Sequence, residues 1–124
     1  MNTQEEISRG REAVFSFNSN LTGCALVFED DGECGYLYVM SAEQKIEEAV
    51  FVYKSESIEP TQSEVLEVAW SADGWVAKVQ LGGELVALFN YRSQQFFSAS
   101  NFPSPRSWSQ LPRAEAEAGF VTRQ

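Results

Sequence analysis

Residues 65–91 constrain the fold more than any other part of the chain. Three segments rich in strand-forming residues are separated there by two glycine turns, Ser71-Ala72-Asp73-Gly74 and Gly82-Gly83. Gly74 suits the left-handed position of a bulged turn, and a Gly-Gly pair suits a two-residue primed turn with positive φ at both positions. The stretch therefore predicts three consecutive antiparallel strands.

The two turns also predict which side chains share a face. In this register Ser71 lies opposite Trp75, and Leu81 lies opposite Glu84. Because side chains alternate along a strand, one face is expected to carry Val65, Ala69, Trp75, Val79, Leu81, Val86 and Leu88. The other face is expected to carry Leu66, Val68, Trp70, Val76, Leu85, Ala87 and Phe89. Both faces are largely apolar, so we expect a second sheet to cover one of them. Residues 96–108, or a second copy of the chain in a homodimer, are expected to cover the other.

Further strands are predicted along the rest of the chain, at residues 12–18, 24–29, 34–40, 49–54 and 96–101. Polar or proline-containing loops are expected at residues 55–63 and 102–105, and Trp108 is expected to pack back on the body. Residues 1–11 predict a frayed end or one helical turn, and residues 112–118 predict a short helix that Gly119 ends.

These elements predict an all-β protein with minor α structure. The arrangement is an antiparallel β-sandwich, or a strongly curved sheet approaching a partial barrel, of seven or eight strands. A chain of 124 residues suits one domain, residues 1–124, in which residues 1–11 and 112–124 are peripheral.

Composition excludes several kinds of partner. The chain has 18 acidic and 9 basic residues, for a net charge of -9, so it repels phosphate backbones and nucleic acid is not an expected partner. It has no apolar run near the ~20 residues of a membrane span and no hydrophobic signal-peptide core. We therefore expect a cytoplasmic protein with no membrane partner.

The absence of histidine narrows the chemistry further. It removes the commonest general base, the usual catalytic triads and most zinc sites. The hairpin register keeps Cys24 and Cys34 too far apart for a disulfide, so both are expected to be free thiols, as in a reducing compartment. No catalytic, cofactor-binding or metal-binding residue is predicted, and we expect a protein without enzymatic activity.

An acidic turn followed by two tyrosines is the clearest polar feature. Four carboxylates occupy the predicted tip of a hairpin, and Tyr36 and Tyr38 share one face of the strand that follows. The carboxylates are those of Glu29, Asp30, Asp31 and Glu33. They favour a solvated turn, and the alternatives are contact with a basic protein partner or binding of calcium, for which the spacing lacks an EF-hand pattern. The six residues together are the predicted partner-binding set.

The sequence around this turn resembles a bacterial family, domain of unknown function 2251. The likeness rests on Phe28-Glu29-Asp30-Asp31-Gly32-Glu33 followed by Gly35-Tyr36-Leu37-Tyr38. It extends to Ile58 onwards, to Trp70, and to Asn101-Phe102-Pro103 with Trp108, and so covers most of the chain. The resemblance implies a small bacterial domain and no particular chemistry.

Three functional hypotheses follow. The first is a protein–protein interaction module, most concretely an acidic inhibitor or immunity-type protein that covers the basic site of a partner. The second is a small-ligand-binding β domain with an aromatic pocket. The third is a carboxylate-based hydrolase, which needs only two acids in one cleft.

Gly35 lies inside a predicted strand. It indicates either a bulge in that strand or a neighbour lying close over it.

Overall fold

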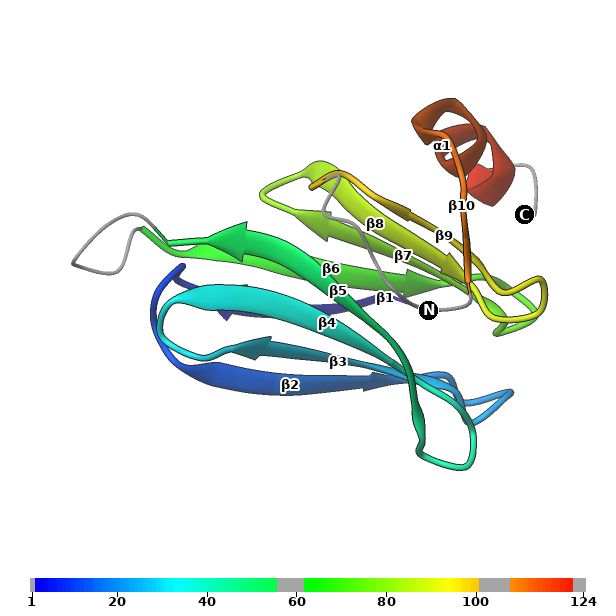
Figure 1. Ribbon diagram of the computed structural model, residues 1–124, viewed down its shortest axis with the longest axis horizontal. Helices are drawn as coiled ribbons and strands as arrows, with labels where there is room; N and C mark the ends of the chain where they lie inside the picture. Colours follow the sequence, from blue (N-terminus) through cyan, green and yellow to red (C-terminus); the bar gives the residue numbers. More distant parts are fainter. Residues whose placement is uncertain (1, 56–61, 101–107, 122–124) are drawn as a thin grey trace.

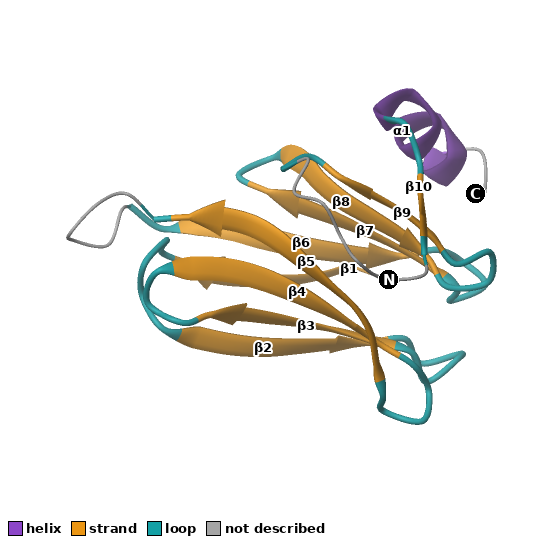
Figure 2. Cartoon of the chain, in the orientation of Figure 1, coloured by secondary structure: helices purple, strands orange, loops and turns teal. Residues whose placement is uncertain are grey.

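The described residues fold into two β-sheets, antiparallel except for one short pair, with one short helix, as a computed structural model shows (Figures 1 and 2). The structure describes residues 2–55, 62–100 and 108–121. A small sheet has the strand order β2-β3-β4-β5, and a large sheet has the order β1-β6-β7-β8-β9-β10. The predicted all-β class with minor helix is therefore confirmed, as two sheets that form no closed barrel.

The small sheet is a meander of consecutive hairpins. Its strands are β2 (Ala13–Asn18), β3 (Ala25–Asp30), β4 (Cys34–Met40) and β5 (Ile46–Lys54). Each strand pairs antiparallel with the next, so the predicted hairpin around the acidic turn is confirmed. The register shifts between Gly35 and Tyr36, where the ring of Tyr53 lies against the Gly35 backbone. The bulge and the close neighbour predicted at Gly35 are both present.

The large sheet contains the three predicted strands and three more. Its strands are β1 (Asn2–Ile7), β6 (Glu64–Trp70), β7 (Val76–Leu81), β8 (Glu84–Asn90), β9 (Gln95–Ser98) and β10 (Ser109–Gln110). β10 pairs parallel with β9, and every other pair is antiparallel. Gly82 and Gly83 have φ of 59° and 85°, so the primed turn is confirmed, and Leu81 does lie opposite Glu84. The described chain thus has ten strands rather than seven or eight.

The expectation for residues 1–11 is wrong, because residues 2–7 form β1. This strand pairs along its whole length with β6, and its last residue, Ile7, is buried. Its other side chains are polar and mostly exposed, as in edge strands that avoid pairing with other molecules. Ile7 is its only apolar side chain, so β1 has no apolar alternation by which the sequence could reveal it.

The predicted register between β6 and β7 is also wrong, by one residue. Trp70 lies opposite Ala77, and the Ser71 N–H donates to the Val76 carbonyl at 2.8 Å. The loop is longer than expected because Asp73 accepts hydrogen bonds from the Ser71 hydroxyl and the Trp75 N–H. Trp75 therefore belongs to the turn.

A one-residue slip moves all of β7 to the opposite face. The face toward the small sheet carries Leu66, Val68, Trp70, Ala77, Val79, Leu81, Ala87 and Phe89. It packs on buried side chains of the small sheet, among them Phe17, Leu26, Phe28, Leu37 and Val39. The outer face of the large sheet is less apolar than expected, because Lys78 and Gln80 lie on it.

The helix α1 (Arg113–Val121) covers the part of that outer face that is apolar. Ala116 is buried there in a second hydrophobic cluster, which includes Val76, Leu85, Leu88 and Phe97. The predicted short helix is confirmed, although it continues beyond Gly119 and supplies the cover expected from residues 96–108. The loop around Pro60 and the irregular segment 102–105 lie outside the described residues, apart from residues 55, 62 and 63. Among the described residues, no helix is long and apolar enough to cross a membrane.

Hydrogen bonds tie the two sheets together at several places. The Tyr91 hydroxyl donates to the Ala25 carbonyl at 2.6 Å, and the buried Glu48 carboxylate accepts from the Trp108 N–H at 3.0 Å. Trp108 is buried against Tyr91, so its predicted return to the body is confirmed. The small sheet is thereby held with one face in the core, and its other face points away from it.

Candidate functional site

The outer face of the small sheet is the candidate functional site. Its side chains alternate with the buried ones of β2 to β5, and none of them belongs to either hydrophobic cluster of the described chain. Its apolar and aromatic members, called the exposed face below, are Val14, Val27, Tyr36, Tyr38, Met40, Ile46 and Phe51. Val14 and Ile46 stand at its two edges and are 64% and 53% exposed.

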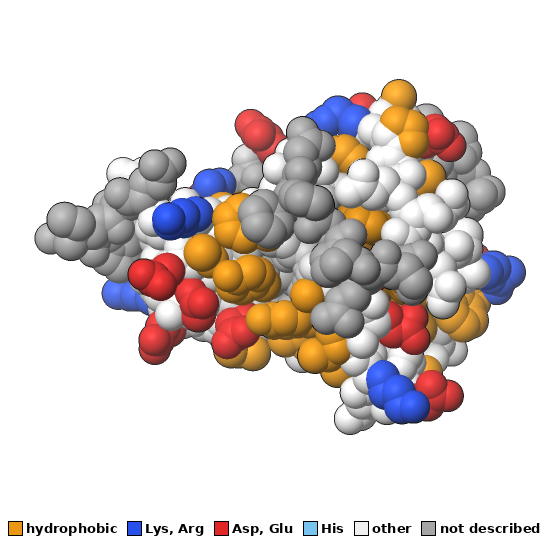
Figure 3. Space-filling model, viewed as in Figure 1, with side chains coloured by type: hydrophobic (Ala, Val, Ile, Leu, Met, Phe, Trp, Pro, Cys, Tyr) orange, Lys and Arg blue, Asp and Glu red, His pale blue; other side chains and the backbone are white. Residues whose placement is uncertain are grey.

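The exposed face is concentrated rather than scattered. Figure 3 shows a band of hydrophobic side chains over β4 and β5, with acidic side chains beside its left end, where β3 turns into β4. Single exposed apolar residues are normal on a protein surface, but contiguous aromatic and apolar patches mark interaction sites. Among residues 2–55, 62–100 and 108–121, no helix or second sheet packs on this face, so the patch calls for a functional explanation.

Two tyrosines form the centre of the exposed face. The rings of Tyr36 and Tyr38 lie side by side at 6.2 Å between centroids, with 27° between their planes. Phe51, opposite Tyr36 on β5, meets the Tyr36 ring edge to face at 6.0 Å. The predicted placement of both tyrosines on one face is confirmed, and their two near-parallel rings are half-buried at the surface.

A carboxylate lies at the rim of this aromatic surface. Glu29 is opposite Tyr36 on β3 and accepts a hydrogen bond from the Tyr38 hydroxyl at 2.9 Å. Burial and this hydrogen bond raise the pKa of Tyr38 to about 12. The neighbouring Cys34 thiol and burial raise the pKa of Tyr36. Both phenols therefore stay neutral at physiological pH, and Glu29 adds an acceptor next to their rings.

The remaining residues of the acidic turn have different roles. Asp31 accepts hydrogen bonds from the N–H groups of Glu33 and Cys34, both at 2.9 Å, and these bonds lower its pKa. Asp31 and Glu33 are both exposed at the tip, whereas Asp30 is 2% exposed. Three of the four predicted carboxylates thus lie at the surface, and Asp30 is not accessible to a partner.

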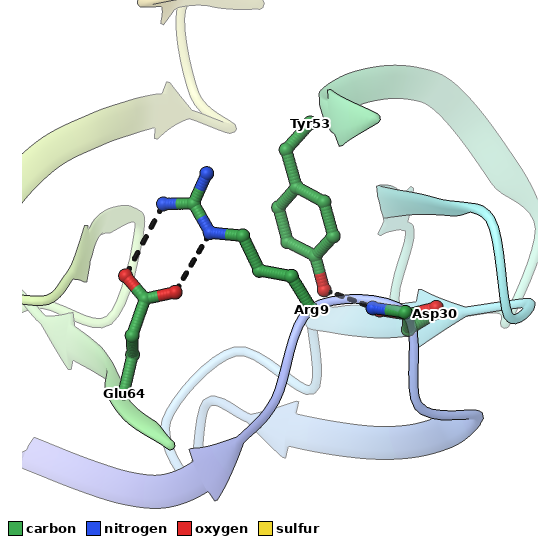
Figure 4. Close-up of polar contacts among 5 residues, drawn as sticks. Arg9, Asp30, Tyr53 and Glu64 are labelled. Atoms are coloured by element: carbon green, nitrogen blue, oxygen red, sulfur yellow. Dashed lines mark hydrogen bonds and ion pairs between the residues drawn. The ribbon is translucent and has the colours of Figure 1, made fainter. Parts of the chain in front are cut away.

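Asp30 belongs instead to a polar cluster that closes this end of the two sheets (Figure 4). Its carboxylate accepts the Tyr53 hydroxyl at 2.6 Å and the Gly10 N–H at 2.9 Å. Arg9 stacks over the Tyr53 ring and binds Glu64 through two hydrogen bonds of 2.7 and 3.2 Å. Sequence reasoning missed this cluster because its members are far apart in the chain.

The opposite end of the exposed face is hollowed. A depression of about 540 Å³ lies there, between the end of β2 and the β4–β5 turn. Val27 and Met40 supply its apolar lining, and Ser16, Asn18 and Gln44 supply polar groups. Among the described residues, no three His, Cys, Asp or Glu side chains gather closely enough to hold a metal ion. The site therefore offers aromatic stacking, apolar contact and carboxylates.

The structure brings together most, but not all, of the predicted site residues. Glu29, Tyr36 and Tyr38 meet on adjacent strands, with Asp31 and Glu33 at the turn beyond them. Sequence reasoning missed Val27, Met40 and Phe51, which complete the face. Val27 and Tyr38 are partners in the register, so the alternation of β3 could have revealed Val27 once the strand order was known.

The fold and the exposed face define an antiparallel two-sheet β protein with an aromatic, acid-edged surface on its small sheet. Residues 7–121 match the family described as an uncharacterised protein conserved in bacteria, DUF2251, and the chain belongs to that family. An uncharacterised protein of Haemophilus influenzae is 28% identical over 95 residues, which cover 73% of this chain and 59% of that relative. The chain therefore spans less than two thirds of the relative's length. No solved structure matches the chain.

Proposed function

We propose that this protein is a protein–protein interaction module whose exposed face docks a basic partner protein. The observation that carries the proposal is the aromatic and apolar outer face of the small sheet, edged by carboxylates. Aromatic residues and Met are enriched at protein interfaces, and Tyr is prominent among binding hot spots. Tyr36, Tyr38, Phe51 and Met40 supply that chemistry on one surface.

Charge supports a basic partner rather than a second copy of the chain. The net charge of -9 makes two copies repel each other and attracts a positively charged protein. Glu29, Asp31 and Glu33 place three negative charges at one end of the exposed face. Lys54, which pairs in register with Cys34, places one positive charge there. An inhibitor or immunity-type role, in which the face covers the basic site of a partner, fits this charge.

The hollow at the other end supports docking of a protein over capture of a small molecule. A drug-sized ligand is usually buried in a mostly apolar cavity. Here the depression opens on a sheet surface, and serines, asparagines and glutamine line much of it. Such a depression suits one apolar side chain of a partner whose other contacts spread over the tyrosines.

Photo-crosslinking in a bacterium that encodes the protein tests the proposal. A photoreactive phenylalanine analogue replaces Val14 or Ile46, at the two edges of the exposed face, or Val65 as the control. Val65 is also an exposed apolar residue, at 43%, but lies on the large sheet. The expected result is one basic protein that is crosslinked from both edge positions and not from Val65. That protein should then bind the purified chain directly. Crosslinks to another copy of the chain, equal crosslinking from Val65, or no crosslink at all would contradict the proposal.

A further inference from the structure

Three arginines of the described chain share one kind of surrounding. Each guanidinium carbon lies 4.9–5.4 Å from the centre of an aromatic ring, and each has a carboxylate nearby. The sets are Arg9 with Tyr53 and Glu64, Arg92 with Trp75 and Asp73, and Arg113 with Phe97 and Glu117. This pairing is physically favourable, because a guanidinium is attracted to a ring face and binds a carboxylate at the same time.

The centre of the exposed face has the same components, but no cation from the described part of the chain occupies it. Tyr36 and Tyr38 present two adjacent rings, and Glu29 lies beside them with Oε1 held by the Tyr38 hydroxyl at 2.9 Å. Within the described chain, no ion pair involves Glu29, and no arginine or lysine lies over either tyrosine ring. Lys54 is paired in register with Cys34, and its ammonium makes no ion pair with Glu29.

We propose that Tyr36, Tyr38 and Glu29 form a slot for an arginine side chain of the partner protein. This inference rests on the proposed docking function and specifies what the exposed face recognises. The guanidinium plane stacks on the tyrosine rings, while its N–H groups donate to the Glu29 carboxylate. Asp31, at the adjacent turn, adds to the negative potential.

The geometry favours arginine over lysine. A guanidinium is planar and weakly hydrated, so it stacks on a ring while keeping donors in its own plane for a carboxylate. An ammonium is compact and strongly hydrated, and it gains less from a flat surface that remains open to water. A neutral side chain of the same shape loses the attraction to both the rings and Glu29. Selectivity therefore separates a built slot from general attraction between opposite charges.

A defined peptide series tests the slot without the natural partner. The probe is the acetylated and amidated peptide Gly-Leu-Arg-Leu-Gly, with matched forms in which lysine or citrulline replaces arginine. NMR titration follows the ring resonances of Tyr36 and Tyr38, assigned from the Tyr36→Leu and Tyr38→Leu variants. We expect the arginine peptide to shift both rings and to bind roughly twofold to fivefold more tightly than either matched form, as a solvent-exposed cation–π contact allows.

A charge-matched pair of variants completes the test. Glu29→Gln should weaken the arginine peptide by roughly threefold to tenfold, the effect of losing one charge-assisted contact. Glu6→Gln removes the same charge from the exposed β1 strand of the large sheet and should change the affinity less than twofold. Equal binding of the arginine and citrulline peptides, equal effects of the two variants, or unmoved ring resonances at millimolar peptide would overturn the slot. If crosslinking at Val14 and Ile46 still succeeds, the docking face stands and only the arginine slot falls.

Discussion

The contact between Gly35 and Tyr53 leads to a prediction about the stability of the small sheet. A Cβ added at Gly35 would lie 2.6–3.0 Å from three atoms of the Tyr53 ring, closer than real Cβ atoms approach. Gly35 has no positive φ, so Gly35→Ala introduces this clash without backbone strain. The ring has little freedom to move, because its hydroxyl is bonded to buried Asp30 and Arg9 stacks on its face.

The expected loss of stability follows from these two contacts. Forcing an extra methyl group into a packed site costs about 1–3 kcal/mol. If the ring shifts, the hydrogen bond to Asp30 is lost as well, and bonds to charged groups contribute about 1.5–3 kcal/mol. We therefore expect Gly35→Ala to lower the free energy of unfolding by about 2–4 kcal/mol. Urea denaturation followed by tryptophan fluorescence measures this difference.

A double-mutant cycle checks that the ring is the cause. In a Tyr53→Leu background the ring is absent, so adding Gly35→Ala should change the free energy of unfolding by less than about 1 kcal/mol. Any change should be stabilising, because alanine is better suited to a strand than glycine. If Gly35→Ala alone melts like wild type, or costs as much with Tyr53→Leu as without it, the packing of Tyr53 on Gly35 is not what constrains this strand.

Three further predictions concern a turn, the thiols and a phenol. Gly74→Ala should destabilise the protein more than Gly83→Ala, because both positions have positive φ but only at Gly74 would a Cβ lie within 3.0 Å of neighbouring atoms; equal melting temperatures would count against the turn geometry. In the native, non-reduced protein Cys34 should react with a thiol reagent while buried Cys24 reacts only after unfolding, and fewer than two free thiols in the denatured chain would contradict both assignments. The Tyr38 phenol should ionise at a pKa of about 12, seen as the difference in ultraviolet absorbance between wild type and Tyr38→Phe. Since this folded-state pKa is raised, its stabilising contribution is full below the ordinary pKa of about 10 and is lost as pH rises through the folded value, and a difference spectrum centred near pH 10 would contradict it.

The parts of the fold that the sequence predicts best depend on local chemistry. The Gly82-Gly83 turn, the β3–β4 hairpin and the bulge at Gly35 each follow from a conformation or a contact that glycine makes easy. The register between β6 and β7 does not follow from local chemistry. The residue types of the loop predict a shorter turn, but the hydrogen bonds of Ser71 and Asp73 lengthen it. The strand β1 could not be predicted because its stability comes from pairing with β6, about sixty residues away in the chain.

The candidate site divides in the same way. Alternation along one strand is enough to place Tyr36 and Tyr38 on a common face. The burial of Asp30 could not be predicted, because two of its hydrogen-bond donors, the Tyr53 hydroxyl and the Gly10 N–H, come from distant segments. The extent of the exposed face depends on strand order, which decides that Val27, Tyr38 and Phe51 lie on neighbouring strands.

The central claim is that the outer face of the small sheet is the docking surface. The most direct test is isothermal titration calorimetry of the partner identified by crosslinking, with the variants Val27→Asp and Val65→Asp. Both variants add one negative charge at an apolar surface position, but Val27 lies on the exposed face opposite Tyr38 and Val65 lies on the large sheet. We predict that Val27→Asp weakens binding at least about tenfold, or 1.4 kcal/mol, while Val65→Asp leaves it unchanged. Equal affinities of the two variants, or a loss at Val65 alone, would contradict the claim.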